Sequence, residues 1–314
     1  MPTPSEIRKQ VTDQIIAALE EGLAPWKRPW TAGGANGRHR NVITGRPYSG
    51  INPWLLQLHA IRHGFSSPYW ATYQQWQAVG CRVKRRPAHV EAGRWAGSIV
   101  FYKPVTKRRA SDSGDETTDR FFVLRNWNIF NLEQVEGEFA KALLANQARP
   151  ELPKFELAER LIKATGATIS HGGDKAFYAR PQGSWPNHSD GDYIVLPERR
   201  SFTMSGAYYE TAFHELAHWS EVRLGWNHTT SGYAAGELVA EIAACYMSTE
   251  LCVPQGESLD NHARYVASWL TAMKADSSYI FKAASQASKV ADYLLAFAGV
   301  STDHKAAEEP AEAA

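Results

Sequence analysis

Two histidines four residues apart, with a glutamate directly after the first, dictate how one stretch of this 314-residue chain can fold. The segment reads His214-Glu215-Leu216-Ala217-His218, and positions four apart lie on one face of an α-helix. Both imidazoles can then bind one metal ion, while Glu215 lies beside them. Apolar residues at helical spacing across residues 206–224 favour this helix. The segment therefore predicts a metal site built on a helix.

A catalytic zinc site of this type needs a third protein ligand and an open coordination position. The sequence offers Glu237 and Glu241 on one face of a second predicted helix, which starts after Ser231-Gly232 and ends before Pro254. We assign Glu237 as the third ligand and Glu241 as the carboxylate that orients a histidine ring. The reverse assignment stays open. We expect Zn²⁺ as the cofactor, or another divalent transition metal such as Mn²⁺.

This donor set predicts a zinc metallopeptidase with an HExxH…E ligand pattern. A bound ion lowers the pKa of its water to about 7, and Glu215 is the catalytic group that takes the proton and passes it to the leaving amine. Candidates for contacts with the oxyanion or the substrate are Tyr233, Tyr208 and His228, among which spacing does not choose. Residues 192–197 predict a strand with an exposed edge, where an extended peptide can pair.

Other interpretations of the same residues remain. The histidines can be hydrogen-bonded members of an ordinary amphipathic helix, or the metal can serve as a structural staple in an inactive domain. A nuclease or primase-associated metal site is disfavoured, because phosphoryl transfer generally uses clustered carboxylates with Mg²⁺. Cys245 and Cys252 lack a paired motif and are predicted to be buried thiols.

Charge is distributed unequally along the chain. Residues 1–150 carry 21 Lys and Arg against 12 Asp and Glu, a net charge of +9, whereas residues 151–314 carry 13 against 21, a net charge of −8. Aromatic residues are interleaved with the cations of the first half, as in proteins that bind single-stranded nucleic acid by stacking bases. The predicted DNA-binding residues are Trp26, Lys27, Arg28, Trp30, Arg38, Arg40, Arg46, Tyr48, Asn52, Trp70, Tyr73, Lys84, Arg85 and Arg86.

We expect an α+β protein of two domains: a mixed α/β nucleic-acid-binding domain, then a mainly helical domain with a small sheet. The expected ranges are 1–138 for the first domain, 139–153 for a linker, 154–302 for the second domain and 303–314 for a disordered tail. Residues 107–119, which are charged and poor in apolar side chains, predict a mobile hairpin loop.

The cellular location is predicted from what the sequence lacks. Three cysteines are too few for a disulfide framework, which fits a reducing cytoplasm. Apolar runs of 18 residues are absent from the sequence, so we expect no membrane partner.

Several separate motifs, taken in order over roughly residues 5–300, resemble the ArdC family of plasmid-borne antirestriction proteins, whose N-terminal region is shared with TraC-type plasmid primases. They are Thr12-Asp-Gln-Ile-Ile16, Pro25-Trp-Lys-Arg-Pro-Trp30, Thr44-Gly-Arg-Pro-Tyr-Ser-Gly-Ile-Asn52, Pro68-Tyr-Trp-Ala-Thr-Tyr-Gln-Gln75, Ile129-Phe-Asn-Leu-Glu-Gln134, Asp192-Tyr-Ile-Val-Leu-Pro197, Tyr208-Tyr-Glu-Thr-Ala-Phe-His-Glu-Leu-Ala-His-Trp219 and Tyr233 through Glu241. The chain departs from the family pattern after Gly80, where Arg82-Val-Lys-Arg-Arg-Pro87 lacks the usual Gly-Glu pair.

The resemblance implies a single-stranded DNA-binding domain followed by a zincin-like metallopeptidase domain. It implies that His214, His218 and Glu237 are ligands, that Glu215 is the acid/base, and that the protein protects incoming plasmid DNA from host restriction. The implied partners are single-stranded DNA and an unidentified protein substrate, such as a restriction component, in the cytoplasm of a bacterium that carries a plasmid or other mobile element. The alternative is a single-stranded DNA-binding protein whose metal domain is structural or inactive.

Overall fold

The structure is a computed structural model of the whole chain, and it describes residues 3–23, 38–110, 116–145, 155–180, 191–202, 204–226, 233–254 and 263–300. The first described helix is α1 (Pro4–Glu20), whose buried Ile7, Val11 and Ile15 recur at helical spacing. Thr3 and Glu6 cap its first turn reciprocally, each side chain accepting a hydrogen bond from the other residue's backbone N–H.

A mixed sheet follows in the first half of the chain. Its elements are β1 (Arg40–Asn41), α2 (Asn52–His63), β2 (Tyr69–Thr72), α3 (Tyr73–Ala78), β3 (Arg82–Val83), β4 (Gly97–Ala110), β5 (Glu116–Asn131), the 3₁₀ turn Leu132–Gln134, β6 (Val135–Glu136) and α4 (Glu138–Ala145). Four strands pair in the order β1-β2-β5-β4, and β3 pairs separately with β6.

Alternation along β2 places the two faces of this sheet in different cores. Trp70 packs on one face with Leu56 of α2, whereas its neighbour Ala71 packs on the other with Trp76 of α3. Successive side chains of a strand point to opposite faces, so one strand supports both layers.

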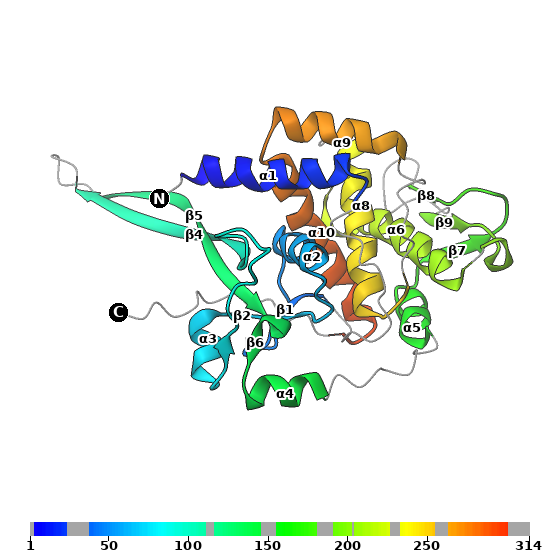
Figure 1. Cartoon of the computed structure of the whole chain (residues 1–314). Coiled ribbons are helices and arrows are strands. Elements are labelled where there is room, and N and C mark those ends of the chain that lie inside the picture. The colour runs from blue at the N-terminus through cyan, green and yellow to red at the C-terminus, as the bar shows by residue number, and fades with distance from the viewer. Residues whose placement is uncertain are drawn as a thin grey trace.

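The β4–β5 hairpin forms a long ribbon that projects from the body of the molecule (Figure 1). Its ladder runs from Gly97 opposite Ile129 to Ala110 opposite Glu116. The prediction of a mobile loop was therefore wrong for residues 107–110 and 116–119. Residues 111–115 lie outside the described part. Backbone pairing adds hydrogen bonds along a two-stranded ribbon even where few side chains are apolar.

The second half is mainly helical with a small sheet, as predicted. Its elements are α5 (Glu156–Ala164), β7 (Thr168–His171), β8 (Phe177–Ala179), β9 (Tyr193–Leu196), the 3₁₀ turn Arg199–Ser201, α6 (Ser205–Leu224), α8 (Tyr233–Glu250), α9 (Ala263–Ala275) and α10 (Tyr279–Phe297).

The strand at residues 192–197 is present as β9, but its predicted exposed edge is wrong. Among the described strands, β9 is central, parallel to β7 and antiparallel to β8. Both sides of β9 are thus hydrogen-bonded, and the edges of this sheet are β7 and β8.

The first part of the segment predicted as a linker, residues 139–153, is helical and not an extended connection. Residues 138–145 form α4, whose Ala140 is buried beside Leu132 and Val135. Ala- and Leu-rich sequence favours a helix once one apolar face has a core to pack against. Residues 146–154 and the predicted tail at residues 303–314 lie outside the described residues.

The largest hydrophobic core contains residues from both halves of the chain. It joins Ile15 of α1 and Trp54 of α2 to Phe213 of α6, Leu238 of α8 and Leu294 of α10. Helix α1 lies along α9, near the other end of the sequence (Figure 1), and Lys274 of α9 donates to Glu20 of α1 at 2.7 Å. The two halves keep separate sheets but share one core.

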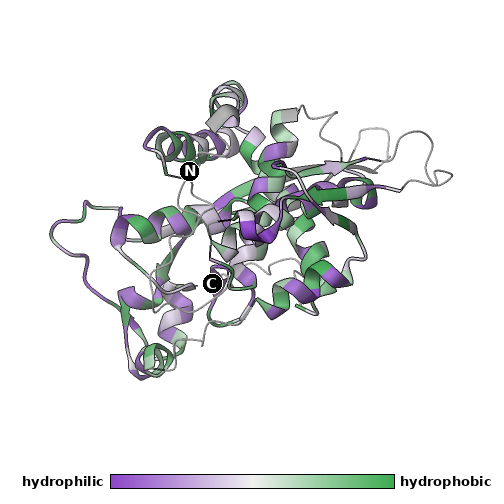
Figure 2. Cartoon of the chain, turned by 90° about the vertical axis from the view of Figure 1, so that its right-hand side faces the viewer, coloured by the Kyte–Doolittle hydropathy of each residue, from purple (hydrophilic) through white to green (hydrophobic). Residues whose placement is uncertain are grey.

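Hydropathy along the helices agrees with this packing. Figure 2 shows hydrophobic and hydrophilic residues alternating along the helices, as expected when one face is buried. None of the described helices combines the length and apolarity that crossing a bilayer requires.

Candidate metal centre and nucleic-acid surface

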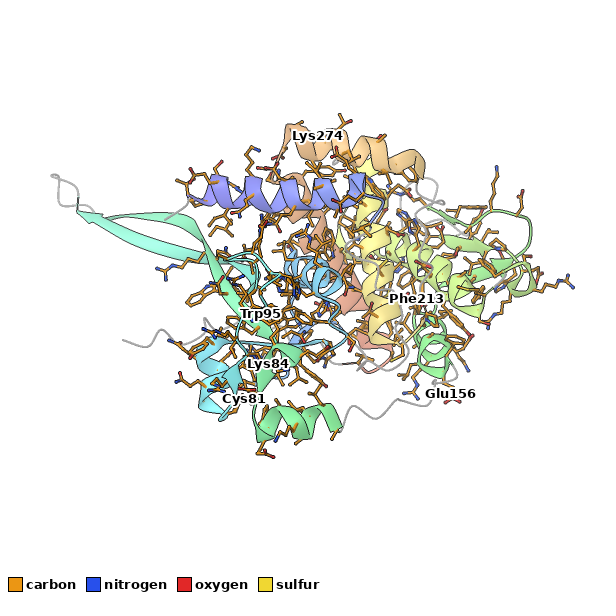
Figure 3. The ribbon with its side chains drawn as sticks, in the orientation of Figure 1. Cys81, Lys84, Trp95, Glu156, Phe213 and Lys274 are labelled. Carbon is orange, nitrogen blue, oxygen red and sulfur yellow. The ribbon has the colours of Figure 1, made fainter. Side chains whose placement is uncertain are left out.

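Helix α6 carries the histidine pair through the packed interior. Phe213 is fully buried there among side chains of neighbouring helices (Figure 3), which fixes the rotation of the helix. One residue later, His214 and His218 lie one turn apart in an edge-to-face arrangement, with ring centroids 4.9 Å from each other. Their Nε2 atoms lie 3.3 Å apart.

Helix α8 packs against α6 and presents Glu237 to both rings. One Glu237 carboxylate oxygen lies 3.5 Å from the His214 Nε2, and the other lies 3.6 Å from the His218 Nε2. Ligand atoms of a tetrahedral Zn²⁺ at ordinary bond lengths are about 3.3–3.5 Å apart. The three groups therefore have the spacing and chemistry to hold one divalent ion.

Glu241 lies one turn further along α8, behind the His214 ring. Its Oε2 is 3.8 Å from the His214 Nδ1, the nitrogen that faces away from the other candidate ligands. Its Oε1 accepts a weak hydrogen bond from the buried Cys245 thiol at 4.0 Å. These distances favour Glu237 as the ligand and Glu241 as the orienting carboxylate.

The electrostatic field at this site is strongly negative. Burial by itself lowers the pKa of His214, but hydrogen bonds to Glu237 and Glu241 and the charges of Glu215 and Glu241 raise that pKa to about 10. Such a field favours any added positive charge, whether a proton or a metal cation.

Glu215 is buried beside the histidines, with 7% of its surface exposed. Burial raises the pKa of its carboxyl group above the ordinary value, His214 lowers it, Glu237 raises it, and a hydrogen bond from the Tyr178 backbone on β8 lowers it. The carboxyl group is thereby held between the ligand cluster and the edge strand β8.

Glu221, which was not predicted from the sequence, accepts a hydrogen bond from the His218 Nδ1 at 2.7 Å. Glu221 is itself almost fully buried and forms an ion pair with Arg180, which follows β8. Its position three residues after His218 on the same helix was a signal that could have revealed it.

The predicted oxyanion and substrate residues are only partly placed. Tyr208 is buried, and its hydroxyl lies 2.9 Å from the His171 Nε2 while Arg199 stacks over its ring. Its hydroxyl is thus already engaged with β7. His228 and the side chain of Tyr233 lie outside the described part.

Two predicted DNA-binding residues, Trp70 and Arg38, are interior residues, and these two predictions were wrong. Tyr48 and Asn52 are also largely buried, but they line a cavity between the two halves of the chain. Trp70 is fully buried and donates through its indole N–H to the His39 Nδ1 at 2.9 Å. Tyr48 and Asn52 are 7% and 6% exposed, and Asn52 bonds both backbone groups of Val100. Arg38, 2% exposed, pairs with acidic residues of the second half.

Arg40 is likewise engaged, with Glu250 at 3.3 Å. Local sequence does not reveal such burial, because the core and the acidic partners come from distant segments. The predicted contacts that are exposed are Arg46, Tyr73, Lys84, Arg85 and Arg86. Trp26, Lys27, Arg28 and Trp30 lie outside the described residues.

Two family models match the chain. Residues 5–130 match the N-terminal domain of the anti-restriction factor ArdC, and residues 156–286 match a zincin-like metallopeptidase domain. The metal-free crystal structure of the antirestriction protein ArdC from plasmid R388 superposes with a TM-score of 0.72 at 30% identity, covering 94% of this chain and 98% of that one. The Mn(II)-bound structure of the same protein gives a TM-score of 0.65 at 28% identity, covering 93% and 97%.

Curated relatives include an uncharacterized protein, y4eC, from Sinorhizobium fredii (strain NBRC 101917 / NGR234), 34% identical over 93% of this chain and 92% of that protein. A DNA primase TraC from Escherichia coli is 35% identical over 91% of this chain. The match covers only 20% of that primase, and 28% of a second TraC primase from the same species.

Proposed function

Since this chain belongs to the family of the antirestriction protein ArdC, we propose that it binds single-stranded DNA and hydrolyses a protein substrate at a metal centre. The DNA-binding domain is assigned to residues 1–138 and the zincin-like domain to residues 154–302. The protein would act in the bacterial cytoplasm, where it protects incoming plasmid DNA from restriction.

The spacing of the three ligand atoms is the observation that carries the enzymatic half of the proposal. His214, His218 and Glu237 would hold Zn²⁺ or Mn²⁺, and Mn(II) is the ion bound in the related ArdC structure. When bound, such an ion supplies the Lewis acidity that makes water nucleophilic at neutral pH.

The remaining chemistry falls to side chains of this chain. Glu215 accepts the proton of the attacking water and returns it to the leaving amine. Glu241 and Glu221 orient the two imidazoles through the Nδ1 atoms, which keeps each Nε2 directed at the ion.

The substrate peptide would pair with β8 rather than with β9. Among the described strands β8 is an edge of its sheet, and the backbone of its Tyr178 reaches Glu215. An extended peptide added to this edge would lie beside the acid/base.

Exposed cations support the DNA-binding half of the proposal. Arg46, Lys84, Arg85 and Arg86 are exposed, and the side chain of Tyr73 is 52% exposed and available for stacking. Contacts of this kind neutralise phosphates and stack bases, which gives binding that weakens as salt rises.

Replacing the acid/base tests the enzymatic half directly. In E215Q, hydrolysis of a fluorescent casein substrate should fall by about 10²-fold or more, because general acid–base catalysis is lost. Metal content and oligonucleotide affinity should stay unchanged in E215Q. In the control E198Q, at an exposed position, metal content, oligonucleotide affinity and casein hydrolysis should all equal those of the wild type.

Casein hydrolysis by E215Q at the wild-type rate would refute the assignment of Glu215. A conjugation assay into a restricting recipient separates the two functional candidates. Full protection by E215Q would show that antirestriction needs DNA binding alone and that the metal domain serves another role.

A further inference from the structure

A cavity of about 670 Å³ opens where the two halves of the chain meet. Its walls come from residues 46–52, the start of α1, β4 and one side of α10. No residue of the metal centre lines it, so it is separate from the proposed peptidase site.

The charged side chains that line this cavity are all cationic. Arg8 and Arg46 come from the first half, and Lys282 and Lys289 come from the second. Among its described lining residues there is no Asp or Glu, although the second half carries a net charge of −8. Lys282 pairs with Asp276, an exposed residue outside the lining, at 3.2 Å, and the other three cations leave the cavity with a positive charge that suits an anionic ligand.

Helix α10 contributes a continuous polar stripe. Ser278, Lys282, Ser285 and Lys289 follow one another at intervals of three or four residues and all line the cavity, so they share one helix face. Both lysines and Ser285 are exposed, and the opposite face of the helix is buried in the shared core. The stripe extends over three turns of helix, which suits an extended anion better than a compact one.

The cavity is preformed by hydrogen bonds between the halves. The Gly50 N–H donates to the Ser288 hydroxyl at 3.0 Å, and the Gly50 carbonyl accepts from the Tyr246 hydroxyl at 2.9 Å. Asn52 bonds the backbone of Val100, which anchors the same loop to β4. Its walls therefore need little rearrangement to receive a ligand.

Two further features indicate the class of ligand. The Nε of Arg8 is buried, and no described residue accepts a hydrogen bond from it. Phe101 of β4 is half-buried at the wall and can stack on a base. The volume suits a ligand of nucleotide size and excludes a duplex.

We propose that this cavity binds the sugar-phosphate backbone of single-stranded nucleic acid, so that the strand passes from the first half onto α10. This inference rests on the proposed DNA binding and adds Lys282 and Lys289, from the metallopeptidase half, to the contact surface. A strand held by both halves would be kept at a fixed distance from the metal centre.

Anisotropy of a fluorescein-labelled oligothymidylate, titrated with full-length protein at several salt concentrations, tests this. In K282A/K289A, affinity should fall about tenfold and the salt slope should become shallower by about 1.4, since each lost phosphate contact removes about 0.7. The matched control K163A/K175A removes two exposed lysines of the same half from outside the cavity and should bind as wild type does.

Three outcomes would overturn the inference. In the first, the wild type binds the oligonucleotide and K282A/K289A shows the same salt dependence of affinity. DNA binding would then stand, but the strand would not pass through this cavity. The control can lose as much as the test variant, which indicates a diffuse charge effect. Inorganic phosphate can bind the wild type but not K282A/K289A while it leaves the oligonucleotide bound, which indicates a site for free phosphate and not for the strand.

Failure of the wild type to bind the oligonucleotide at all would have a separate meaning. It would refute the proposed DNA binding itself, and with it the role assigned to the cavity.

Discussion

At the scale of single residues, the proposed metal centre depends on carboxylates outside the proposed ligand set. Glu221 accepts a hydrogen bond from the His218 Nδ1 and forms an ion pair with Arg180. It thereby fixes the orientation of the His218 imidazole from the side opposite the Nε2. Hydrogen bonds to the distal nitrogen of a ligating histidine fix its tautomer and raise its basicity. The Glu221 side chain is 1% exposed, so water cannot replace this acceptor easily.

Neutralising this carboxylate should weaken the metal site. In E221Q, affinity for Zn²⁺ should fall by about 10–100-fold, because the amide accepts a weaker hydrogen bond from the imidazole. Competition with a chromophoric chelator measures this, with E198Q at an exposed position as the control. Equal chelator competition by E221Q and wild type would contradict the positioning role of Glu221.

At the scale of elements, α6 must approach the chain segment that follows α8. A Cβ added to Gly206, in the first turn of α6, would lie 2.2 Å from the Pro254 carbonyl oxygen. A side chain is therefore excluded where the backbone of one segment contacts the helix that carries both histidines. The glycine permits the approach that aligns α6 with α8.

The substitution G206A tests this contact. Alanine gains about 1 kcal/mol of helix propensity, but a clash with backbone costs about 1–3 kcal/mol. The net effect should be a loss of stability in urea unfolding followed by tryptophan fluorescence. G191A, where an added Cβ meets nothing within 4 Å, should be neutral or slightly stabilising, and an equal response of both variants would contradict the account.

At the scale of the whole molecule, a buried ion pair network connects the two halves. The Arg38 Nε donates to Glu250 at 2.8 Å and its Nη2 donates to Asp292 at 3.0 Å. Burial by itself lowers the pKa of the Arg38 guanidinium, but the two carboxylates together raise this pKa by more than burial lowers it. The guanidinium therefore stays positively charged. Arg38 also lies over the Tyr246 ring, which places it against α8 as well as α10.

Removing this cation should destabilise the assembly of the two halves. In R38M, the carboxylates of Glu250 and Asp292 lose their buried partner, which should cost about 3–5 kcal/mol. Chemical denaturation measures the loss. The control K9A, which removes an exposed ion pair with Asp13, should lose no more than about 0.5 kcal/mol of stability. A similarly small loss for R38M would contradict a stabilising role of the buried ion pair network.

Local sequence signals specify individual helices, and separate motifs identify the family to which the chain belongs. Periodicity predicted α6 and α8, because a helix is specified by neighbours three and four residues apart. The same local spacing brought His214 and His218 to one face, whereas the extension of the β4–β5 ladder had too weak an apolar signal to be predicted.

Long-range packing determines which cations are buried and which face solvent. Arg38 was predicted to contact DNA, yet it is buried against Glu250 and Asp292, which lie 212 and 254 residues away in the sequence. Lys282 and Lys289 belong to the half of the chain with a net charge of −8, yet they line a cationic cavity with Arg46. The physical reason is that burial and local field are set by what packs across a residue, and those neighbours come from remote parts of the chain.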